Sequence, residues 1–316
     1  MMKKTFAALA ACMASLLLAG SAHAGVIDLG IGGANVFTSG NFKGSNNGTA
    51  GAVVAGGNVN LTSFALNRNN QTAYNGYALV AGGSLTMSNG SLNNGMVYAG
   101  AGTALSQNVG KNGVSNSAVL PLTFSATAAH ALAVSSQLDT LGATGSFKSQ
   151  YGGLYLTGSG RSLEVFDLSA NDLTGAGWLN VSGIGNGATV IVNVSGAANG
   201  VIKSLGDFGS TANVLYNFVD AVKLDFSSID LKGSMLAPNA TITGGNGQIG
   251  GNVVAGAWDS QLTLTGQNYF RNVDAKGFEL DAAASAVPEP STLLLVALGL
   301  SAVAFSARRH SLRSKP

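Results

Sequence analysis

One short phrase of the sequence occurs twice and limits what the chain can fold into. VVAGGNVNL at residues 53–61 returns as LVAGGSLTM at residues 79–87. In both copies, apolar and polar residues alternate after a Gly-Gly pair, which indicates half-buried β-strands that follow a turn. Because glycine tolerates a positive φ, we expect the pairs at 56–57 and 82–83 to form corners.

Two pairs of alanines share one spacing. Ala81 precedes Ala99 by eighteen residues, and Ala237 precedes Ala255 by the same number. Three short strands and their turns need about eighteen residues, which is one coil of a β-solenoid. We therefore expect residues 25–285 to form an all-β domain, a right-handed parallel β-helix with Ala237 and Ala255 on adjacent coils.

A segment without glycine interrupts the strand pattern. Residues 121–141, PLTFSATAAHALAVSSQLDTL, are rich in alanine and leucine. Apolar or small residues recur at spacings of three and four, which is typical of an amphipathic helix. We expect one long α-helix packed alongside the β-helix. Its predicted buried stripe is Phe124, Ala128, Leu132, Ser135 and Leu138.

The first 24 residues have the organisation of a secretory signal peptide. Two lysines precede an apolar core at residues 6–18, and Ala-His-Ala at residues 22–24 forms a cleavage site. We expect export through the Sec route and cleavage between Ala24 and Gly25. Residues 9–12 also fit a lipoprotein box, but they would leave a much shorter apolar core.

The last residues, 286–316, contain an apolar stretch followed by a basic tail. Residues 292–307 carry no charge, and as a helix they would extend roughly 24 Å against a hydrocarbon core of about 30 Å. The positive-inside rule keeps the basic residues in the cytoplasm and everything before the helix outside. We expect a transmembrane helix at 292–307, stopped by Arg308, Arg309 and Arg313.

A proline-flanked acid precedes this helix. Pro288, Glu289 and Pro290 hold the backbone extended just outside the membrane. The order of triplet, apolar span and basic end resembles the PEP-CTERM sorting signal. That resemblance implies recognition and cleavage by the membrane protease exosortase, in Gram-negative bacteria that make exopolysaccharide. A permanent C-terminal anchor is the alternative, so whether the tail is cleaved or retained stays open.

Charge and cysteine content exclude several classes of function. Charged residues make up 9% of the chain, and residues 25–287 hold ten basic and thirteen acidic side chains. No basic patch supports nucleic-acid binding. Cys12, the single cysteine, lies in the signal peptide, so the exported body has no thiol or disulfide chemistry.

Several further phrases carry a family resemblance. VNVSG at 192–196, LYNFVDA at 215–221 and KGSMLAPNATI at 232–242 join VVAGGNV and the alanine-rich helix. Together they resemble the choice-of-anchor A domain over nearly all of residues 25–280. The resemblance implies a cell-surface protein that is attached through one of several alternative anchors, PEP-CTERM among them. Some relatives are described as collagen-binding adhesins, and the family defines no catalytic residues.

The asparagines of these phrases have structural interpretations of their own. Asn193 is expected to stack inside a coil. Asn217 and Asn239 are expected to cap neighbouring turns through side-chain to backbone hydrogen bonds.

An enzyme is the less favoured interpretation. His130 is the only histidine between the signal peptide and the C-terminal sorting segment, and no nucleophile elbow or histidine cluster is present. A glycosidase needs two carboxylates that face one cleft, and a Ca²⁺ site needs more oxygen ligands than two aspartates supply. We therefore expect no enzymatic activity, no cofactor and no metal. The carboxylates considered are Asp167, Asp172, Asp220, Asp225 and Asp230.

Two binding functions remain as alternatives in the sequence. Thr241-x-Thr243 and Thr263-x-Thr265 would place threonines outward on two nearby strands, as on an ice-binding β-helix, although ordinary β-propensity explains them too. Tyrosines in glycine- and asparagine-rich segments are suited to stacking on sugar rings, or to packing at coil edges. They are Tyr74, Tyr77, Tyr98, Tyr151 and Tyr155.

The sequence as a whole predicts a secreted, surface-sorted, non-enzymatic structural or adhesive protein. Its expected partners are an exosortase, an exopolysaccharide or matrix protein, and the membrane at least transiently. It would pass through an inner-membrane intermediate to the cell envelope or the extracellular matrix. An ice-binding-like protein and a polysaccharide-active β-helix enzyme are the alternatives.

Overall fold

The computed structural model describes residues 24–278 and residue 280. Most of the predicted signal peptide lies outside these residues, and so do the Pro288–Pro290 triplet, the apolar span and the basic tail. Ala24 and Gly25, the predicted cleavage site, are the first residues of β1 (Ala24–Ile27), which pairs antiparallel with β21 (Val273–Lys276). Among the described residues, no helix has the length and apolarity needed to cross a membrane.

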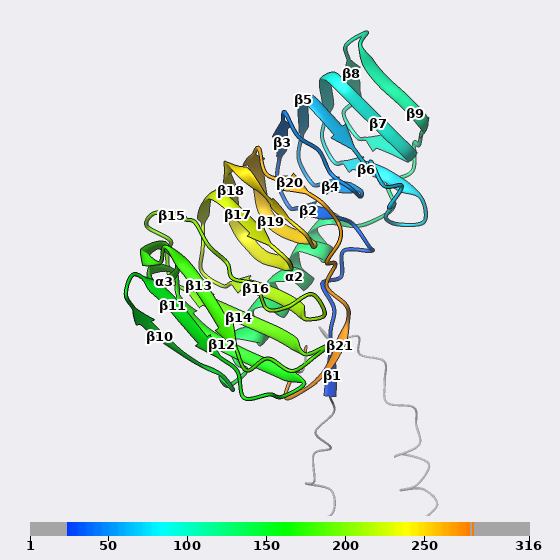
Figure 1. The fold of residues 1–316 in the computed structure, drawn as a ribbon. Coiled ribbons are helices and arrows are strands. Elements are labelled where there is room, and N and C mark those ends of the chain that lie inside the picture. Colours follow the sequence, from blue (N-terminus) through cyan, green and yellow to red (C-terminus); the bar gives the residue numbers. More distant parts are fainter. Residues whose placement is uncertain (1–23, 279, 281–316) are drawn as a thin grey trace, which may run out of the picture. The chain divides into compact units, whose positions relative to one another are not determined.

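The protein is mostly β, and one large sheet of sixteen strands, nearly all paired in parallel, dominates it (Figure 1). Long chain segments such as β18 (Ser234–Ile249) pair in three successive parts, so the strands form three rows. Row one is continuous from end to end. It contains β12 (Leu163–Ser169), β14 (Thr189–Ser195), β16 (Asn213–Phe218), the start of β18, the start of β19 (Val253–Ser260), β2 (Val36–Thr38), β4 (Val53–Ala55), β6 (Tyr77–Ala81) and the end of β7 (Leu85–Ala99).

Rows two and three run beside row one and share several of its chain segments. Row two contains β15 (Val201–Ile202), the start of β17 (Lys223–Leu231), the middle of β18, the end of β19, β3 (Phe42–Ser45), the start of β5 (Val59–Leu66), the start of β7 and β8 (Thr103–Leu105). Row three contains the ends of β17, β18 and β5, the middle of β7, β20 (Thr263–Leu264) and β9 (Val109–Asn116).

The register confirms the spacing seen in the sequence. Ala237 pairs with Ala255 and Ala81 pairs with Ala99, each on neighbouring parallel strands. Ala55 pairs with Ala81 as well, although more residues separate them, because the loop that carries Tyr74 lengthens that repeat. An eighteen-residue offset therefore corresponds to one step between strands.

The order of strands in space differs from their order in the chain. β19, near the end of the domain, pairs with β2 and β3, near its beginning. Row one consequently ends in β12 on one side and, one strand beyond β7, in the last residues of β9 on the other, both from the interior of the chain. Beyond β12 lie the short helix α3 (Ala170–Gly175) and a separate three-stranded sheet. This sheet consists of β10 (Ser146–Gln150), β11 (Gly153–Thr157) and β13 (Trp178–Ser182).

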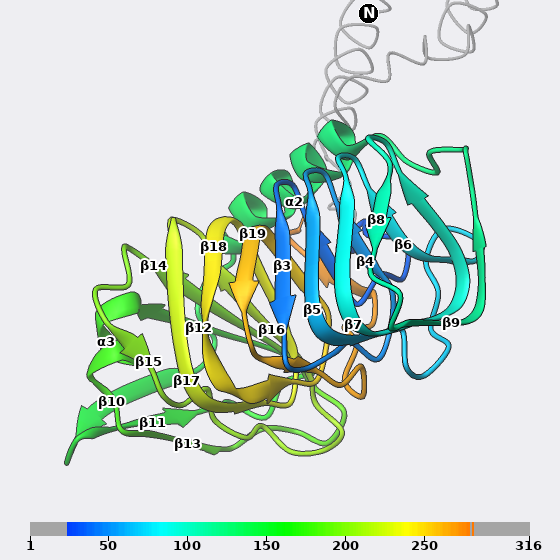
Figure 2. The ribbon, with the colours of Figure 1, turned by 90° about the horizontal axis from the view of Figure 1, so that it is seen from above.

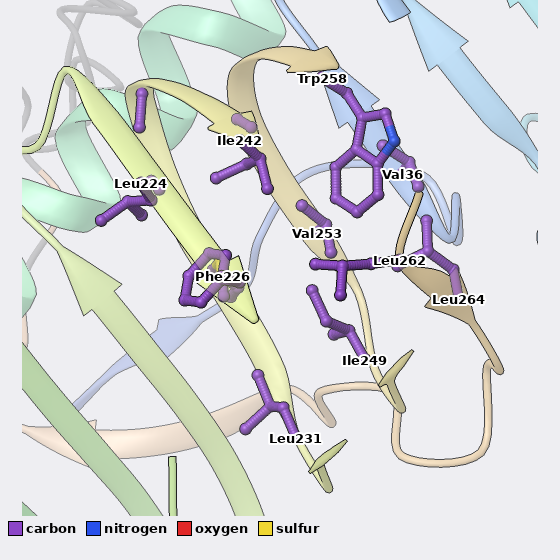
Figure 3. Close-up of a cluster of buried hydrophobic side chains, with 14 of the residues drawn as sticks. Val36, Leu224, Phe226, Leu231, Ile242, Ile249, Val253, Trp258, Leu262 and Leu264 are labelled. Atoms are coloured by element: carbon purple, nitrogen blue, oxygen red, sulfur yellow. The ribbon is translucent and has the colours of Figure 1, made fainter. Parts of the chain in front are cut away.

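The three rows enclose one apolar core. Side chains that alternate along each strand point inward, and Leu224, Phe226, Ile242 and Trp258 are buried together (Figure 3). Trp258 stacks on Phe42 of the next strand with ring centroids 5.8 Å apart. Each such buried side chain contributes about 1.5–3 kcal/mol.

Helix α2 (Phe124–Asp139) lies against row one, over β14, β16 and β18. The predicted helix is confirmed, but its predicted stripe is wrong at Leu132, which is 40% exposed. Ser135 and Leu138 are buried as predicted, and Ala131 and Val134 are buried in addition. Small residues line the contact because the helix packs close to the sheet, and Leu132 falls on the flank of that stripe.

The Gly-Gly pairs form corners, but not for the predicted reason. None of these four glycines has φ in the left-handed region. The neighbouring strand leaves no room for a side chain: a Cβ on Gly82 would lie 2.2 Å from the carbonyl oxygen of Gly56, and one on Gly56 would lie 2.3 Å from that of Ser39. Glycine is required because successive corners stack backbone on backbone.

Candidate binding face

The strands of row two lie side by side across the molecule (Figure 2). Their outward-facing residues form one line. The inward neighbours of these residues, Phe42, Val59 and Trp258 among them, belong to the core. We call the outward residues the row-two line. By strand register they are Asp225, Thr243, Asp259, Lys43, Asn60, Thr86 and Ala104.

An ion pair divides the row-two line. Lys43 Nζ lies 3.1 Å from a carboxylate oxygen of Asp259, and both side chains are more than half exposed. Such a surface pair adds little stability, but it places two full charges in the middle of the line. A regular ladder of hydroxyl groups is therefore interrupted at this point.

The β5 and β7 part of row two is uncharged and ordered by cross-strand hydrogen bonds. Asn58 Oδ1 accepts bonds from the backbone N–H of Ser84 at 2.9 Å and from its hydroxyl at 3.1 Å. Ser88 donates its hydroxyl to Thr62 Oγ1 at 3.4 Å. Repeated amide and hydroxyl groups at the strand spacing of about 4.8 Å give this part a flat, polar and uncharged surface.

The two predicted threonine pairs do not form one face. Thr241 and Thr243 belong to row two, where they pair with Ala257 and Asp259. Thr263 belongs to row three and pairs with Gln248. A turn between the rows separates the pairs, so the prediction of two aligned outward pairs is wrong.

Three buried side chains connect helix α2 to row one. Asn217 Nδ2 donates to Asn193 Oδ1 at 3.0 Å and to the carbonyl oxygen of Ser135 at 2.9 Å, and its Oδ1 accepts the Ser135 hydroxyl at 2.6 Å. Asn193 Nδ2 donates to the carbonyl oxygen of Leu138 at 2.9 Å. Asn193 does meet the amide of Asn217, but on the outer side of row one under α2 and not inside the core as predicted. The prediction that Asn217 caps a neighbouring turn is wrong, because its amide bonds to the helix. These amides fasten the helix to the sheet.

Asn239 behaves differently from its two counterparts. Its side chain is exposed in β18. Among the side-chain hydrogen bonds of the described residues, none involves it. The prediction that Asn239 caps a turn is wrong, because the turn it was expected to cap is part of a continuous strand.

Four of the five candidate carboxylates already accept hydrogen bonds from other groups of the fold. Asp172 closes a capping box with Ser169 at the start of α3. Asp167 accepts a hydrogen bond from Asn193 at 3.1 Å, and Asp230 on row three accepts one from Gln248 at 2.8 Å. Asp220 accepts the backbone N–H of Gly196, while Asp225 lies on row two. Asp167 and Asp220 both lie near Asp139 at the end of α2, where burial and the charges of Asp220 and Asp167 raise the pKa of the Asp139 carboxyl.

Histidine chemistry and metal binding find no assembled site in the described residues. His130 Nε2 lies 2.9 Å from the carbonyl oxygen of Asp28, and its ring covers Gly30. No group of three or more His, Cys, Asp or Glu side chains in this part of the chain is arranged so that it could hold a metal ion.

A buried carboxylate that the sequence did not single out is Glu164 in β12. Burial alone would raise its pKa, but hydrogen bonds from Thr144, Ser159 and the backbone of Arg161 outweigh that effect and lower the pKa. Glu164 therefore stays ionised and ties the loops at 144 and 159–161 to β12. No spacing pattern marks such a residue in advance.

The five tyrosines lie in two distant groups. Tyr77 is buried and donates to the carbonyl oxygen of Val119 at 2.7 Å, and Tyr74 and Tyr98 belong to the same end of the sheet. Tyr151 and Tyr155 belong to the three-stranded sheet. One common sugar site for all five is therefore excluded.

These features define a class: a mostly β protein with long parallel strand rows, a docked helix and a flat polar outer line. Comparison with known families assigns it more closely. Residues 30–266 match a family described as "Putative Ice-binding-like adhesive domain", and the chain belongs to this family. No curated protein matched the chain, and no solved structure did.

The end of the chain matches a second family description. Residues 286–309 match the PEP-CTERM protein-sorting motif, as the triplet at 288–290 predicted. This motif indicates secretion and sorting to the cell envelope, and it implies processing by an exosortase. The chain therefore combines an adhesive-type domain with a surface-sorting motif.

Proposed function

We propose that this protein is a secreted, non-enzymatic structural or adhesive component of the cell envelope or exopolysaccharide matrix. One observation carries the proposal: an ice-binding-like adhesive domain and a PEP-CTERM sorting motif occur on the same chain. In this proposal the Sec signal peptide exports the chain, and the tail holds it in the inner membrane until exosortase acts.

The finer description of the fold is part of the same proposal. We take the three rows as the three sides of a right-handed β-solenoid, with α2 along one side, and the domain as a choice-of-anchor A domain. The continuous register from Ala237 through Ala255, Ala55 and Ala81 to Ala99 supports stacked coils. A rigid stack with flat sides is suited to holding a surface or a polymer.

The absence of catalysis is likewise proposed rather than measured. Its support is that four of the five candidate carboxylates already accept hydrogen bonds from other groups of the fold. A polysaccharide-active enzyme would need two of them in one cleft.

Intact mass of the envelope-associated protein tests the sorting proposal. Replacement of Pro288, Glu289 and Pro290 by alanine should leave export intact and prevent cleavage, so the full-length tail stays in the inner membrane. The matched control replaces Ser291, Thr292 and Ser301 by alanine and should be processed like the wild type. If wild type and triplet variant both still carry residues 292–316 in hosts with and without exosortase, the tail is a permanent anchor.

A second candidate is ice binding, which the family description favours. The uncharged part of row two, with Asn60, Thr62, Thr86 and Ser88, is the surface that would contact ice. Thr86→Tyr should then abolish thermal hysteresis, whereas Thr263→Tyr on row three should leave it unchanged. Wild-type protein without thermal hysteresis would remove this candidate and leave the adhesive one standing.

A further inference from the structure

The outer face of the three-stranded sheet at the β12 end combines aromatic rings with uncharged polar groups. Register places Gln150, Gly153 and Trp178 in one outward line, and Lys148, Tyr155 and Asn180 in the next. The opposite side of the sheet carries Leu154 and Leu156, which are buried. Lys148 is the only charged residue on the three strands. We call the outer face of this sheet, with Tyr151 of its hairpin turn, the aromatic platform.

Trp178 lies over the backbone of two glycines. A Cβ added to Gly153 would lie 2.3 Å from the Trp178 indole nitrogen, and one on Gly152 would lie 3.9 Å from the far end of its six-membered ring. The indole thus spans both residues and packs on bare backbone with one face. The side chain remains 46% exposed, so the ring is held in place while much of it stays open to solvent.

Tyr151 occupies a position that is unfavourable for tyrosine. It has φ 53° and is followed by Gly152 with φ 79° in the two-residue turn between β10 and β11. Turns of this kind favour Asn-Gly or Asp-Gly, and a bulky residue in the left-handed region is strained. The side chain is 85% exposed and gains almost no packing in return. Strain of this kind, retained without a folding benefit, points to a functional role.

Polar groups surround the rings. The hydroxyls of Thr157 and Ser182 lie 3.4 Å apart beside Tyr155 and Asn180. Hydroxyl, amide and ammonium groups of this kind exchange hydrogen bonds with hydroxylated ligands.

We propose that the aromatic platform binds a polysaccharide chain. A sugar ring has an apolar face of C–H groups and a rim of hydroxyls, which fits aromatic faces bordered by amides and hydroxyls. The single positive charge and the absence of carboxylates on the three strands favour neutral or acidic polymers over cationic ones. The inference rests on the proposed matrix function, for which it names the ligand class and the site.

Tryptophan fluorescence reports on this site in the purified domain, residues 25–280. Residues 24–278 make up one compact unit with their own core. The chain has two tryptophans, and Trp258 is buried with 1% exposure, so acrylamide quenches mainly Trp178. The probes are hydroxyethyl cellulose, xylan, alginate and the crude exopolysaccharide of the producing bacterium. We expect at least one of them to protect Trp178 from quenching and to retard the protein in affinity electrophoresis.

Two variants and a control locate the binding. Trp178→Ala should weaken retardation by about tenfold or more, as for a central anchor of an interface. Tyr151→Asn should weaken binding as well, yet raise the melting temperature, because asparagine suits the left-handed turn. Val222→Ala, at an apolar residue that is 69% exposed in the β16–β17 turn, should change neither property.

Three results would overturn the inference. They are no binding of the wild type to any of the four probes, full binding by Trp178→Ala, and protection of Trp178 by a second copy of the protein without polysaccharide. The last would identify the surface around Trp178 on β13 as a self-association site. Each of these results leaves the exosortase experiment untouched, so failure here is distinguishable from failure of the proposed function.

Discussion

Removal of the Asn217 side chain should loosen the contact between helix α2 and row one. Asn217→Ala deletes three buried hydrogen bonds: two donated by Nδ2 at 2.9 and 3.0 Å and one accepted by Oδ1 at 2.6 Å. Each bond contributes about 1 kcal/mol, and leaving the buried Asn193 Oδ1 without its donor adds about 1–2 kcal/mol. The expected loss is therefore roughly 4 kcal/mol.

Thermal unfolding of the purified domain measures this loss. For a domain of this size, 1 kcal/mol corresponds to about 2–4 °C, so the melting temperature should fall by roughly 8–16 °C. The matched control is Asn239→Ala, because Asn239 is exposed in β18. It should change the melting temperature by less than about 2 °C. Equal shifts in the two variants, or a shift below about 3 °C for Asn217→Ala, would refute the role given to the buried amides.

Three further predictions concern the corner, the helix and pH. Gly82→Ala should destabilise the domain by about 1–3 kcal/mol, because its Cβ meets the Gly56 carbonyl oxygen. Gly142→Ala, with open space around it, should be tolerated. Equal denaturation midpoints for the two variants would contradict the stacked-corner explanation. Val134→Ala should lower the free energy of unfolding by about 1–3 kcal/mol and Leu132→Ala by less than about 0.5 kcal/mol, since only Val134 is buried. The reverse order in urea unfolding would mean that the helix packs with its Leu132 face against row one. Because its pKa is lowered in the folded state, ionised Glu164 stabilises the fold at pH values above its usual pKa of 4.5, and this stabilisation is lost as the pH falls below that value. The Glu164→Gln variant should be less stable than the wild type at pH 7, and its stability should decline less at acidic pH. Parallel pH profiles of stability for the two proteins would argue against an ionised Glu164.

The strand rows could be predicted from the sequence because their cause is local. Alternation along 53–61 and 79–87 sets which residues are buried, and a fixed spacing brings like residues into register, as Ala237 and Ala255 show. The helix was predictable for the same reason. Its exact buried face was not, because one residue of rotation exchanges Leu132 for Ala131, and only the packing against row one decides between them.

The parts that the sequence did not predict depend on contacts between distant segments. The pairing of β19 with β2 joins residues more than 200 positions apart, and no sequence repeat with a fixed spacing predicts it. The separation of the two threonine pairs follows from a turn that changes rows. The aromatic platform likewise depends on β13 returning beside β11, which places Trp178 next to Gly153.

The insertion of β2 and β3 next to β19 has a consequence for how the chain acquires its structure. During synthesis the strands from 36 to 116 are complete long before residues 253–260 exist, so one edge of the early half stays unpaired until the last large strand arrives. Such late, long-range closure gives a high contact order and slow folding, with an edge exposed to foreign strands meanwhile. The closing step is made by residues a short distance before the sorting motif at 286–309. The domain therefore cannot close before nearly the whole chain that precedes the sorting motif has been made.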